Sequence, residues 1–265
     1  MSEAECVSNA ILAKFPHDSV ANFVFGLAVF HYGHHSYAIT LFRNALRADP
    51  NNVEAQQALE TAIRTMRAAK PHDVCVIGNS HTGLFKPIRD VSVFWVGPVT
   101  MRRLGKEGTE FLDYRNFGIG AGATVVAVFG EIDVRAHFMK RSDGSDRSIA
   151  EVADSLVSGY LRTLAEAFKI SGAQRQIVAS LPPPFREGIQ VKHESIGDVR
   201  QRVAVTVAVN ERFRFGCQLL GFGYLDLYTP FANEAGALAE QFTEDGFHIH
   251  INQAGLAAQE LRKLL

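Results

Sequence analysis

One short stretch decides the fold: residues 74–81, which read VCVIGNSH. Residues 74–77 are apolar, include β-branched side chains and stop at Gly78, a pattern typical of a strand buried on both faces of a parallel sheet. Asn, Ser and His follow at once. Because α/β sheets bind their ligands outside the carboxyl ends of the strands, Ser80 could be a nucleophile. It could equally cap the helix that follows the strand, since Ser is favoured at that position.

Four further apolar runs predict the rest of a sheet. Together with the first run, the predicted strands are 73–78, 91–97, 123–130, 175–181 and 222–227. Helical patterns lie between and after them, at 149–171, 198–219 and about 253–264. Strands that alternate with helices indicate a doubly wound sheet. We therefore expect an α/β domain with a five-stranded parallel sheet over residues 71–265.

Residues 1–70 form a second predicted region, which is all helical. Its segment 19–52 resembles a tetratricopeptide repeat. The resemblance rests on Phe25, Gly26, Ala38, Phe42, Ala45 and Pro50, and the sequence departs from the pattern at Asn22 and Val29. We expect four helices, one full repeat between two half repeats, with Phe42 filling the seam beside Gly26. So short a helical-repeat array should pack on the following domain, and could offer a groove to a protein partner or act as a cap or dimerisation element.

Composition excludes several classes of function. The 265 residues include 27 Lys and Arg against 28 Asp and Glu, a formal net charge of -1, which argues against nucleic-acid binding. No apolar stretch approaches the roughly 20 residues of a membrane helix, and the N-terminus lacks the pattern of a signal peptide. We expect a cytoplasmic protein without membrane contact. Cys6, Cys75 and Cys217 are scattered, which predicts neither disulfides nor a zinc site, and we expect no metal or cofactor.

Polar and glycine-rich residues follow most of the predicted strands. They are Gly78-Asn79-Ser80-His81 after the first, Gly97 and Thr100 after the second, Gly130-Glu131-Ile132-Asp133 after the third, and Asp245-Gly246-Phe247-His248 beyond the fifth. In this order the blocks resemble those of the SGNH (GDSL-type) hydrolase family, over about residues 73–265. The resemblance implies a flavodoxin-like three-layer sandwich that carries an esterase-like or acyl-transfer site.

The resemblance implies Ser80 as nucleophile, His248 as general base and Asp245 as the group that orients His248. A serine hydroxyl is a weak nucleophile at neutral pH, so it needs an adjacent base, and the base needs a partner that holds its tautomer. His250 is an alternative base, because alternation in the segment FHIHI puts it on the same face as His248. Spacing does not choose between the two histidines, whereas the resemblance favours His248.

Compared with the pattern of the SGNH family, the oxyanion hole of this chain lacks one donor. The family pattern implies the backbone N–H groups of Ser80 and Gly97, and a side-chain amide from an Asn at the position of Ile132. An isoleucine cannot donate, and loss of one donor costs about 2.7–4 kcal/mol of transition-state stabilisation. Arg135 is the substitute we expect, and His137 lies close to it in sequence; a guanidinium could also bind an anionic part of the substrate.

Several other residues are candidates for substrate contact. They are Asn79, His81, Thr100, Glu131, Asp133, His137 and Arg186, with His193 as a secondary candidate. Glu131 and Asp133 lack the companions of a metal site, so they could instead orient Arg135 or the Ser80 loop. The long segment 182–197 should border the pocket. The basic residues within 97–108 are either a solvated turn or a contact for an anionic substrate.

We therefore expect a serine-dependent esterase whose small-molecule substrate is a carbohydrate ester. An O-acyltransferase would use the same triad, with a hydroxyl group in place of water. A non-catalytic protein of the SGNH fold, acting in binding or as a scaffold, is the alternative from another class. Ile132 favours that alternative, and the intact set of Ser80, Asp245 and His248 argues against it.

Overall fold

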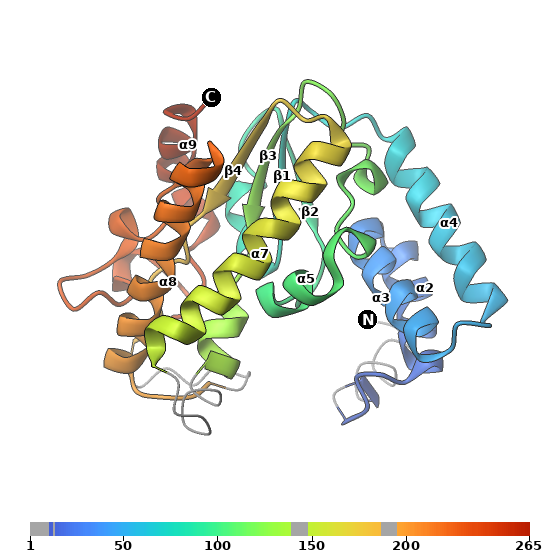
Figure 1. The fold of residues 1–265 in the computed structure, drawn as a ribbon, viewed down its shortest axis with the longest axis horizontal. Helices are drawn as coiled ribbons and strands as arrows, with labels where there is room; N and C mark the ends of the chain where they lie inside the picture. The colour runs from blue at the N-terminus through green and yellow to red at the C-terminus, as the bar shows by residue number, and fades with distance from the viewer. Residues whose placement is uncertain (1–10, 13, 139–147, 187–194) are drawn as a thin grey trace.

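A computed structural model describes residues 11–12, 14–138, 148–186 and 195–265 of the chain (Figure 1). A sheet lies at the centre, long helices cover it, and the N-terminal helices α2, α3 and α4 stand at one side. Among the described helices, none is both long and apolar enough to cross a membrane.

The sheet has five parallel strands in the order β2-β1-β3-β4-β5. Their bounds are β1 Val74–Gly78, β2 Val91–Trp95, β3 Thr124–Val128, β4 Arg175–Ala179 and β5 Gly223–Leu225. This is the flavodoxin-like order, so the five predicted strands and the α/β class are confirmed. The order reverses at β1, with β2 on one side and β3 on the other. Ligands of such sheets bind at this switch point.

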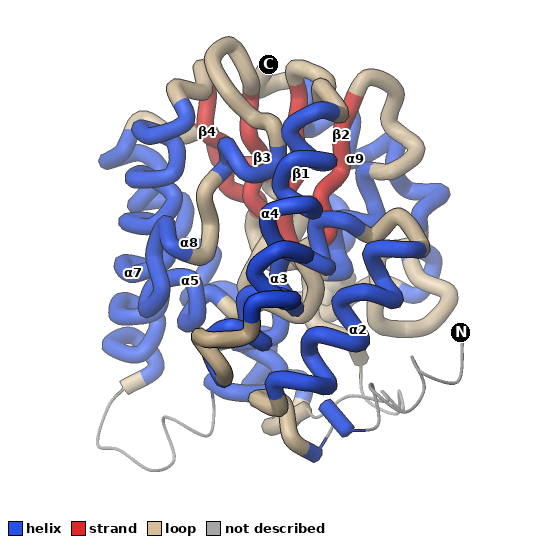
Figure 2. The backbone as a smooth tube through the Cα atoms, turned by 90° about the vertical axis from the view of Figure 1, so that its right-hand side faces the viewer, coloured by secondary structure: helices blue, strands red, loops and turns tan. Residues whose placement is uncertain are grey.

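Helices cover both faces of the sheet. α5 (Met101–Glu107), α7 (Ile149–Ser171) and α8 (Val199–Leu220) lie on one face, and α9 (Ala254–Arg262) lies on the other (Figure 2). Capping boxes begin α7 at Ser148 and α8 at Asp198, which explains why both helices start where the sequence predicts. Alternate strand residues serve the two layers: Ile77 packs in the cluster that contains α7 and α8, and Val76 packs in the cluster with α9.

The N-terminal region contains α2 (Ser19–His31), α3 (His35–Ala48) and α4 (Val53–Ala68). Gly26 and Phe42 form the seam between α2 and α3: a Cβ at Gly26 would lie 2.6 Å from the Phe42 ring. Much of the half repeat expected before residue 16 lies outside the described residues. The helices are observed, while their origin as a tetratricopeptide-like repeat stays a prediction, as does the domain boundary at residues 70 and 71.

The helical region packs directly on the sheet domain, as expected for so short an array. Side chains such as Phe42 and Met66 belong to the same buried cluster as Ile77 and Phe94, so one hydrophobic core runs through both parts. α3 also covers the outer edge of β2. The Ser36 hydroxyl donates to the Trp95 carbonyl at 2.6 Å, and the Thr40 hydroxyl donates to the Val96 carbonyl at 2.9 Å. These bonds satisfy carbonyl groups that an edge strand would otherwise expose.

Candidate active site

The last residue of β1 lies so close to β3 that only glycine fits there. A Cβ at Gly78 would lie 2.0 Å from the carbonyl oxygen of Val128 on β3. The Asn79 N–H then donates to that same carbonyl, at 3.1 Å, and the short 3₁₀ helix η1 (Ser80–Phe85) begins. Close packing of β1 against β3 therefore delivers Ser80 to the switch point, beyond the carboxyl end of the strand.

The cap of this short helix is Asn79 and not Ser80. The Asn79 side-chain oxygen accepts a hydrogen bond from the His81 N–H at 3.2 Å. Ser80 occupies the first helical position and is exposed, so its hydroxyl is free for another partner. The alternative in which Ser80 serves only as a helix cap is therefore wrong. Asn79 itself is 1% exposed, which also removes it from the candidates for substrate contact.

The Ser80 hydroxyl meets a histidine and a carboxylate in series. His248 Nε2 lies 3.1 Å from Ser80 Oγ, and His248 Nδ1 lies 2.7 Å from Asp245 Oδ2. Nδ1 carries the proton in the tautomer that fits this chain, because Asp245 can only accept and Nε2 must accept from the serine. Burial raises the pKa of Asp245, but hydrogen bonds from His248 and Phe247 outweigh it and lower that pKa to about 2. The carboxylate is therefore charged at neutral pH.

A tight turn sets the geometry of the carboxylate and the imidazole. Asp245 Oδ1 accepts from the backbone N–H groups of Phe247, at 2.8 Å, and His248, at 2.7 Å. Gly246 has φ +75°, in the left-handed region that glycine adopts without strain. One carboxylate oxygen thus fixes the turn, while the other faces the imidazole. The Asp-x-x-His spacing has a physical reason in this turn.

His250 is held elsewhere by its own partners. Its Nε2 pairs with Glu244 Oε1 at 3.0 Å, and its Nδ1 accepts from the Asn252 N–H at 3.2 Å. Both ring nitrogens are therefore engaged, and the structure gives the serine to His248. Spacing alone left open whether His248 or His250 faces Ser80, and the structure places His248 there.

The two backbone N–H groups predicted for the oxyanion hole have no acceptor among the described residues. Neither the N–H of Ser80 nor that of Gly97 donates to another residue in the described part of the chain. Ser80 stands in the first turn of η1, where helical N–H groups have no internal acceptor. The Val96 N–H donates to the Gly78 carbonyl at 2.9 Å, which places Gly97 alongside the end of β1. Their roles in an oxyanion hole stay predictions.

Asp133 has a structural role that excludes it from substrate contact. It is fully buried, and its carboxylate accepts from the N–H groups of Met101, at 2.6 Å, and Arg102, at 3.2 Å. The prediction of a substrate contact is therefore wrong for Asp133, because its oxygens hold the first turn of α5. Thr100 is also engaged there, since its hydroxyl accepts from the Arg103 N–H at 3.1 Å.

Arg135 lies in a short π-helix, Asp133–Phe138, and is 8% exposed. Its Nε donates to Glu131 Oε1 at 2.6 Å, and its guanidinium lies 5.2 Å from the centroid of the Phe247 ring. It lines a small cavity next to the one that contains Ser80, and His81 borders both cavities. The position of Arg135 as a third oxyanion donor therefore stays a prediction.

His81 and Glu131 form a buried polar contact behind the serine. His81 Nε2 lies 4.0 Å from Glu131 Oε2, and neither atom has a hydrogen-bond partner among the described residues. Burial lowers the pKa of His81 to about 3, with further contributions from His248 and Arg135, and burial raises the pKa of Glu131. His81 is therefore neutral at pH 7. Its ring centroid lies 5.0 Å from that of His248, so a charged His81 would oppose protonation of the base.

A cavity of about 370 Å³ opens at Ser80. Apolar side chains form much of its lining, and charged ones contribute the rest. The apolar residues are Leu84, Pro182, Leu227, Ile249 and Ile251, and the charged ones outside the triad are Lys86 and Glu244. The segment 182–197 was expected to border the pocket, and Pro182 does so. The other residues were missed, because single positions in loops carry no periodic signal. Phe247 was also missed, although its place inside the Asp-x-x-His segment is a signal that it lies near the site.

The other predicted contacts lie away from this cavity. Thr100 lines a different cavity, beside α3, and Arg186 pairs with Glu240 at 3.0 Å. His137 is half-buried in the π-helix. His193 and the rest of residues 187–194, half of the 182–197 segment, fall outside the described residues. Within the described ranges, no group of three or more His, Cys, Asp or Glu side chains is placed to hold a metal ion.

The fold is shared with solved structures. Neither a family model nor a curated protein matches this chain. A Streptococcus pneumonia protein provisionally named as a platelet activating factor superposes with a TM-score of 0.55 at 13% identity, over 81% of this chain and 99% of that one. A GDSL-like lipase from Bacteroides thetaiotaomicron gives 0.50 at 20% identity, over 77% and 98%. At these identities the likeness establishes the α/β fold alone.

Proposed function

We propose that the protein is a serine-dependent esterase that acts through an acyl-serine intermediate. The observation that carries the proposal is the hydrogen-bonded series from Ser80 through His248 to Asp245, at 3.1 and 2.7 Å. The fold shared with a GDSL-like lipase supports the same reading. Three groups in this geometry make a serine hydroxyl nucleophilic at neutral pH, which an isolated serine is not.

The first half of the reaction forms the acyl-enzyme. Ser80 Oγ attacks the ester carbonyl carbon while its proton passes to His248 Nε2. Asp245 stabilises the imidazolium through Nδ1 and keeps its own charge. When the tetrahedral intermediate collapses, His248 returns the proton to the departing alcohol. In the second half, His248 takes a proton from water, whose oxygen attacks the acyl carbon. The carboxylic acid then leaves, and Ser80 regains its proton.

The oxyanion that forms in both halves would be held by the N–H groups of Ser80 and Gly97. With Ile132 in place of an amide donor, only two backbone donors are assigned, and catalysis should be slower than with three. Loss of one such donor costs a factor of about 10²–10³ in kcat. Arg135 remains the proposed third donor, and its Nε already donates to Glu131.

The lining of the cavity bears on the substrate. Its apolar side chains suit the acyl part of an ester, because burial of apolar surface favours binding. A carbohydrate ester stays our proposal for the alcohol part. If a sugar hydroxyl and not water resolves the acyl-serine, the same residues catalyse O-acyl transfer. We also keep the cytoplasm as the proposed location, and a protein partner as the proposed ligand of the helical region.

Labelling by a fluorophosphonate, followed by hydrolysis of a short acyl p-nitrophenyl ester, tests the proposal. Wild type should label and hydrolyse, and Ser80→Ala should do neither. Ser155→Ala, which removes an exposed hydroxyl on α7, is the matched control and should behave as wild type. Labelling without hydrolysis, but with transfer to an added alcohol, would favour the acyltransferase. A wild-type protein that neither labels nor exceeds Ser80→Ala would refute catalysis and favour the non-catalytic alternative.

A further inference from the structure

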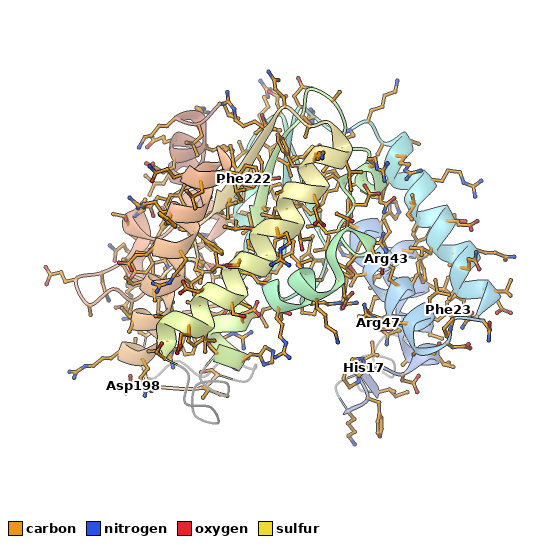
Figure 3. The ribbon with its side chains drawn as sticks, in the orientation of Figure 1. His17, Phe23, Arg43, Arg47, Asp198 and Phe222 are labelled. Carbon is orange, nitrogen blue, oxygen red and sulfur yellow. The ribbon has the colours of Figure 1, made fainter. Side chains whose placement is uncertain are left out.

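A second cavity of about 370 Å³ lies between α3 and the segment that follows β2. It shares no lining residue with the cavity at Ser80. One wall comes from α3 and the residues before α2, including His17 and Arg47, which Figure 3 shows on the side of the helical region that faces α5. The other wall comes from residues 98–107. The cavity therefore exists only because the helical region packs on the sheet domain.

The lining of this cavity is strongly basic. It contains four basic side chains, Arg47, Arg102, Arg103 and Lys106, and a single carboxylate, Glu107, which leaves a formal excess of three positive charges. The whole chain has a formal net charge of -1, so this excess is local. Like charges gathered in a concave site raise the local concentration of anions.

The one carboxylate is already engaged on the inner side of the cavity. Glu107 pairs with Arg103, whose Nε lies 2.9 Å from Oε1, and also with Arg47. Arg103 is further fixed by Asn44 Oδ1, at 2.5 Å, and by the Phe111 ring, whose centroid lies 4.3 Å from its guanidinium. Burial and the nearby charge of Arg47 lower the pKa of Arg103. The inner wall is therefore a rigid cationic surface.

Arg102 and Lys106 complete the cavity without carboxylate partners. Both are exposed, and neither forms an ion pair with a residue in the described part of the chain. They also border a cavity of about 340 Å³ beside α7, which offers Ser155 but no further cation. Arg47 and Arg103 line only the first cavity, so an anion gains most by binding there.

We infer that this cavity binds a small molecule that carries a phosphate or diphosphate group. A phosphate group has about two negative charges at pH 7 and several acceptor oxygens, which match two free cations beside a fixed guanidinium. A single carboxylate would neutralise only one of the three excess charges. A nucleic-acid strand would need a basic surface that extends beyond the cavity. The chain as a whole has 27 basic and 28 acidic side chains, so it has no such excess of positive charge.

Calorimetric titration with inorganic pyrophosphate, at constant ionic strength set with sodium chloride, tests this inference. Constant ionic strength removes general screening from the comparison. Wild type should bind saturably, and Arg102→Gln/Lys106→Gln should bind at least about tenfold more weakly because two charge-assisted contacts are lost. Arg64→Gln/Lys169→Gln removes the same charge from exposed positions on α4 and α7, and should stay within about twofold of wild type.

Both double variants change exposed side chains, so their melting temperatures without ligand should match that of wild type. The absence of saturable pyrophosphate binding by folded wild-type protein would overturn the inference. An equal loss of affinity in the two double variants would also overturn it, because binding would then follow total charge and not this cavity. None of these outcomes depends on ester hydrolysis.

Discussion

At the scale of single residues, the site combines a charged group and a neutral one, and both lie close to His248. Asp245 stabilises the protonated base, while His81 must stay neutral so that it does not oppose protonation. The carboxylate is kept ionised by hydrogen bonds, and the histidine is kept neutral mainly by burial. The two environments differ because Asp245 lies in an exposed turn and His81 is buried.

Asp245→Asn should lower kcat for p-nitrophenyl ester hydrolysis by about 10³–10⁴, as loss of the orienting carboxylate does in serine hydrolases. The amide would hold His248 in the wrong tautomer or leave it without a stabilising charge. Glu244→Gln is the matched control, because Glu244 also lines the cavity but pairs with His250. An Asp245→Asn enzyme within tenfold of wild type would remove Asp245 from the triad.

His81 should make the folded protein sensitive to acid. The unfolded chain takes up a proton at His81 below about its ordinary pKa of 6.5, whereas the folded protein does not do so until pH approaches about 3. Stability should therefore fall as pH drops through this window, by about 1.4 kcal/mol per pH unit. The raised pKa of Glu131 acts in the opposite direction.

Comparison with a His81→Phe variant isolates the contribution of His81. Urea unfolding at pH 6.5, 5.5 and 4.5 should show a smaller loss of stability for His81→Phe than for wild type. His72→Phe, at an exposed histidine, is the control and should follow wild type. Parallel pH profiles for wild type and His81→Phe would show that His81 titrates freely in the folded state.

At the scale of elements, α3 supports the loop that carries the proposed oxyanion donor. Gly97 has φ +84°, and a Cβ there would lie 2.2 Å from the Tyr37 ring. The two carbonyl groups before Gly97 are held by the hydroxyl groups of Ser36 and Thr40. The position of Gly97 is therefore fixed by residues of α3: the Tyr37 ring packs against it, and two hydrogen bonds hold the residues before it.

Tyr37→Ala should lower kcat by about 10–10³ with little change in KM, because a loosened Gly97 N–H acts in the transition state and not in substrate binding. Tyr37→Phe keeps the ring and should behave as wild type. Loss of a large side chain also costs stability, so both rates are measured well below the melting temperature of each variant. Equal kcat for Tyr37→Ala and Tyr37→Phe would show that α3 does not position this loop.

The elements also show what the sequence could reveal. The strands were predictable because buried parallel strands are continuous apolar runs, and α7 and α8 because their capping residues are explicit. The convergence of Ser80 with His248 was predicted only through the resemblance to the SGNH family, because spacing left His250 equally open. The contact between Tyr37 and Gly97 was not predictable, because it depends on how two regions dock. The burial of Asp133 was hidden for the same reason: its partners are backbone groups of a distant segment.

At the scale of the whole molecule, the helical region and the sheet domain share one hydrophobic core. A shared core predicts that the two parts unfold together, because neither can lose its partner without exposing buried apolar surface. This bears on both proposed sites. The cavity of basic residues is formed by the two parts jointly, and the Gly97 loop is supported by α3.

Trp95 is the single tryptophan of the chain, and its fluorescence reports on the contact between the helical region and the sheet domain. Its ring lies 4.7 Å from that of Tyr37 and 5.7 Å from that of His34, both in the helical region. Urea unfolding followed by Trp95 fluorescence should coincide with unfolding followed by far-ultraviolet circular dichroism.

Phe42→Ala, in the seam between α2 and α3, should move both unfolding curves together to lower urea. The free energy of unfolding from either curve should fall by about 3–5 kcal/mol. Phe213→Ala, on α8 in the same core, is the control and should also shift both curves. If the fluorescence transition of Phe42→Ala moved to lower urea while the dichroism curve kept a separate, unshifted phase, the helical region would be an independent unit. The two proposed sites would then open before the sheet unfolds.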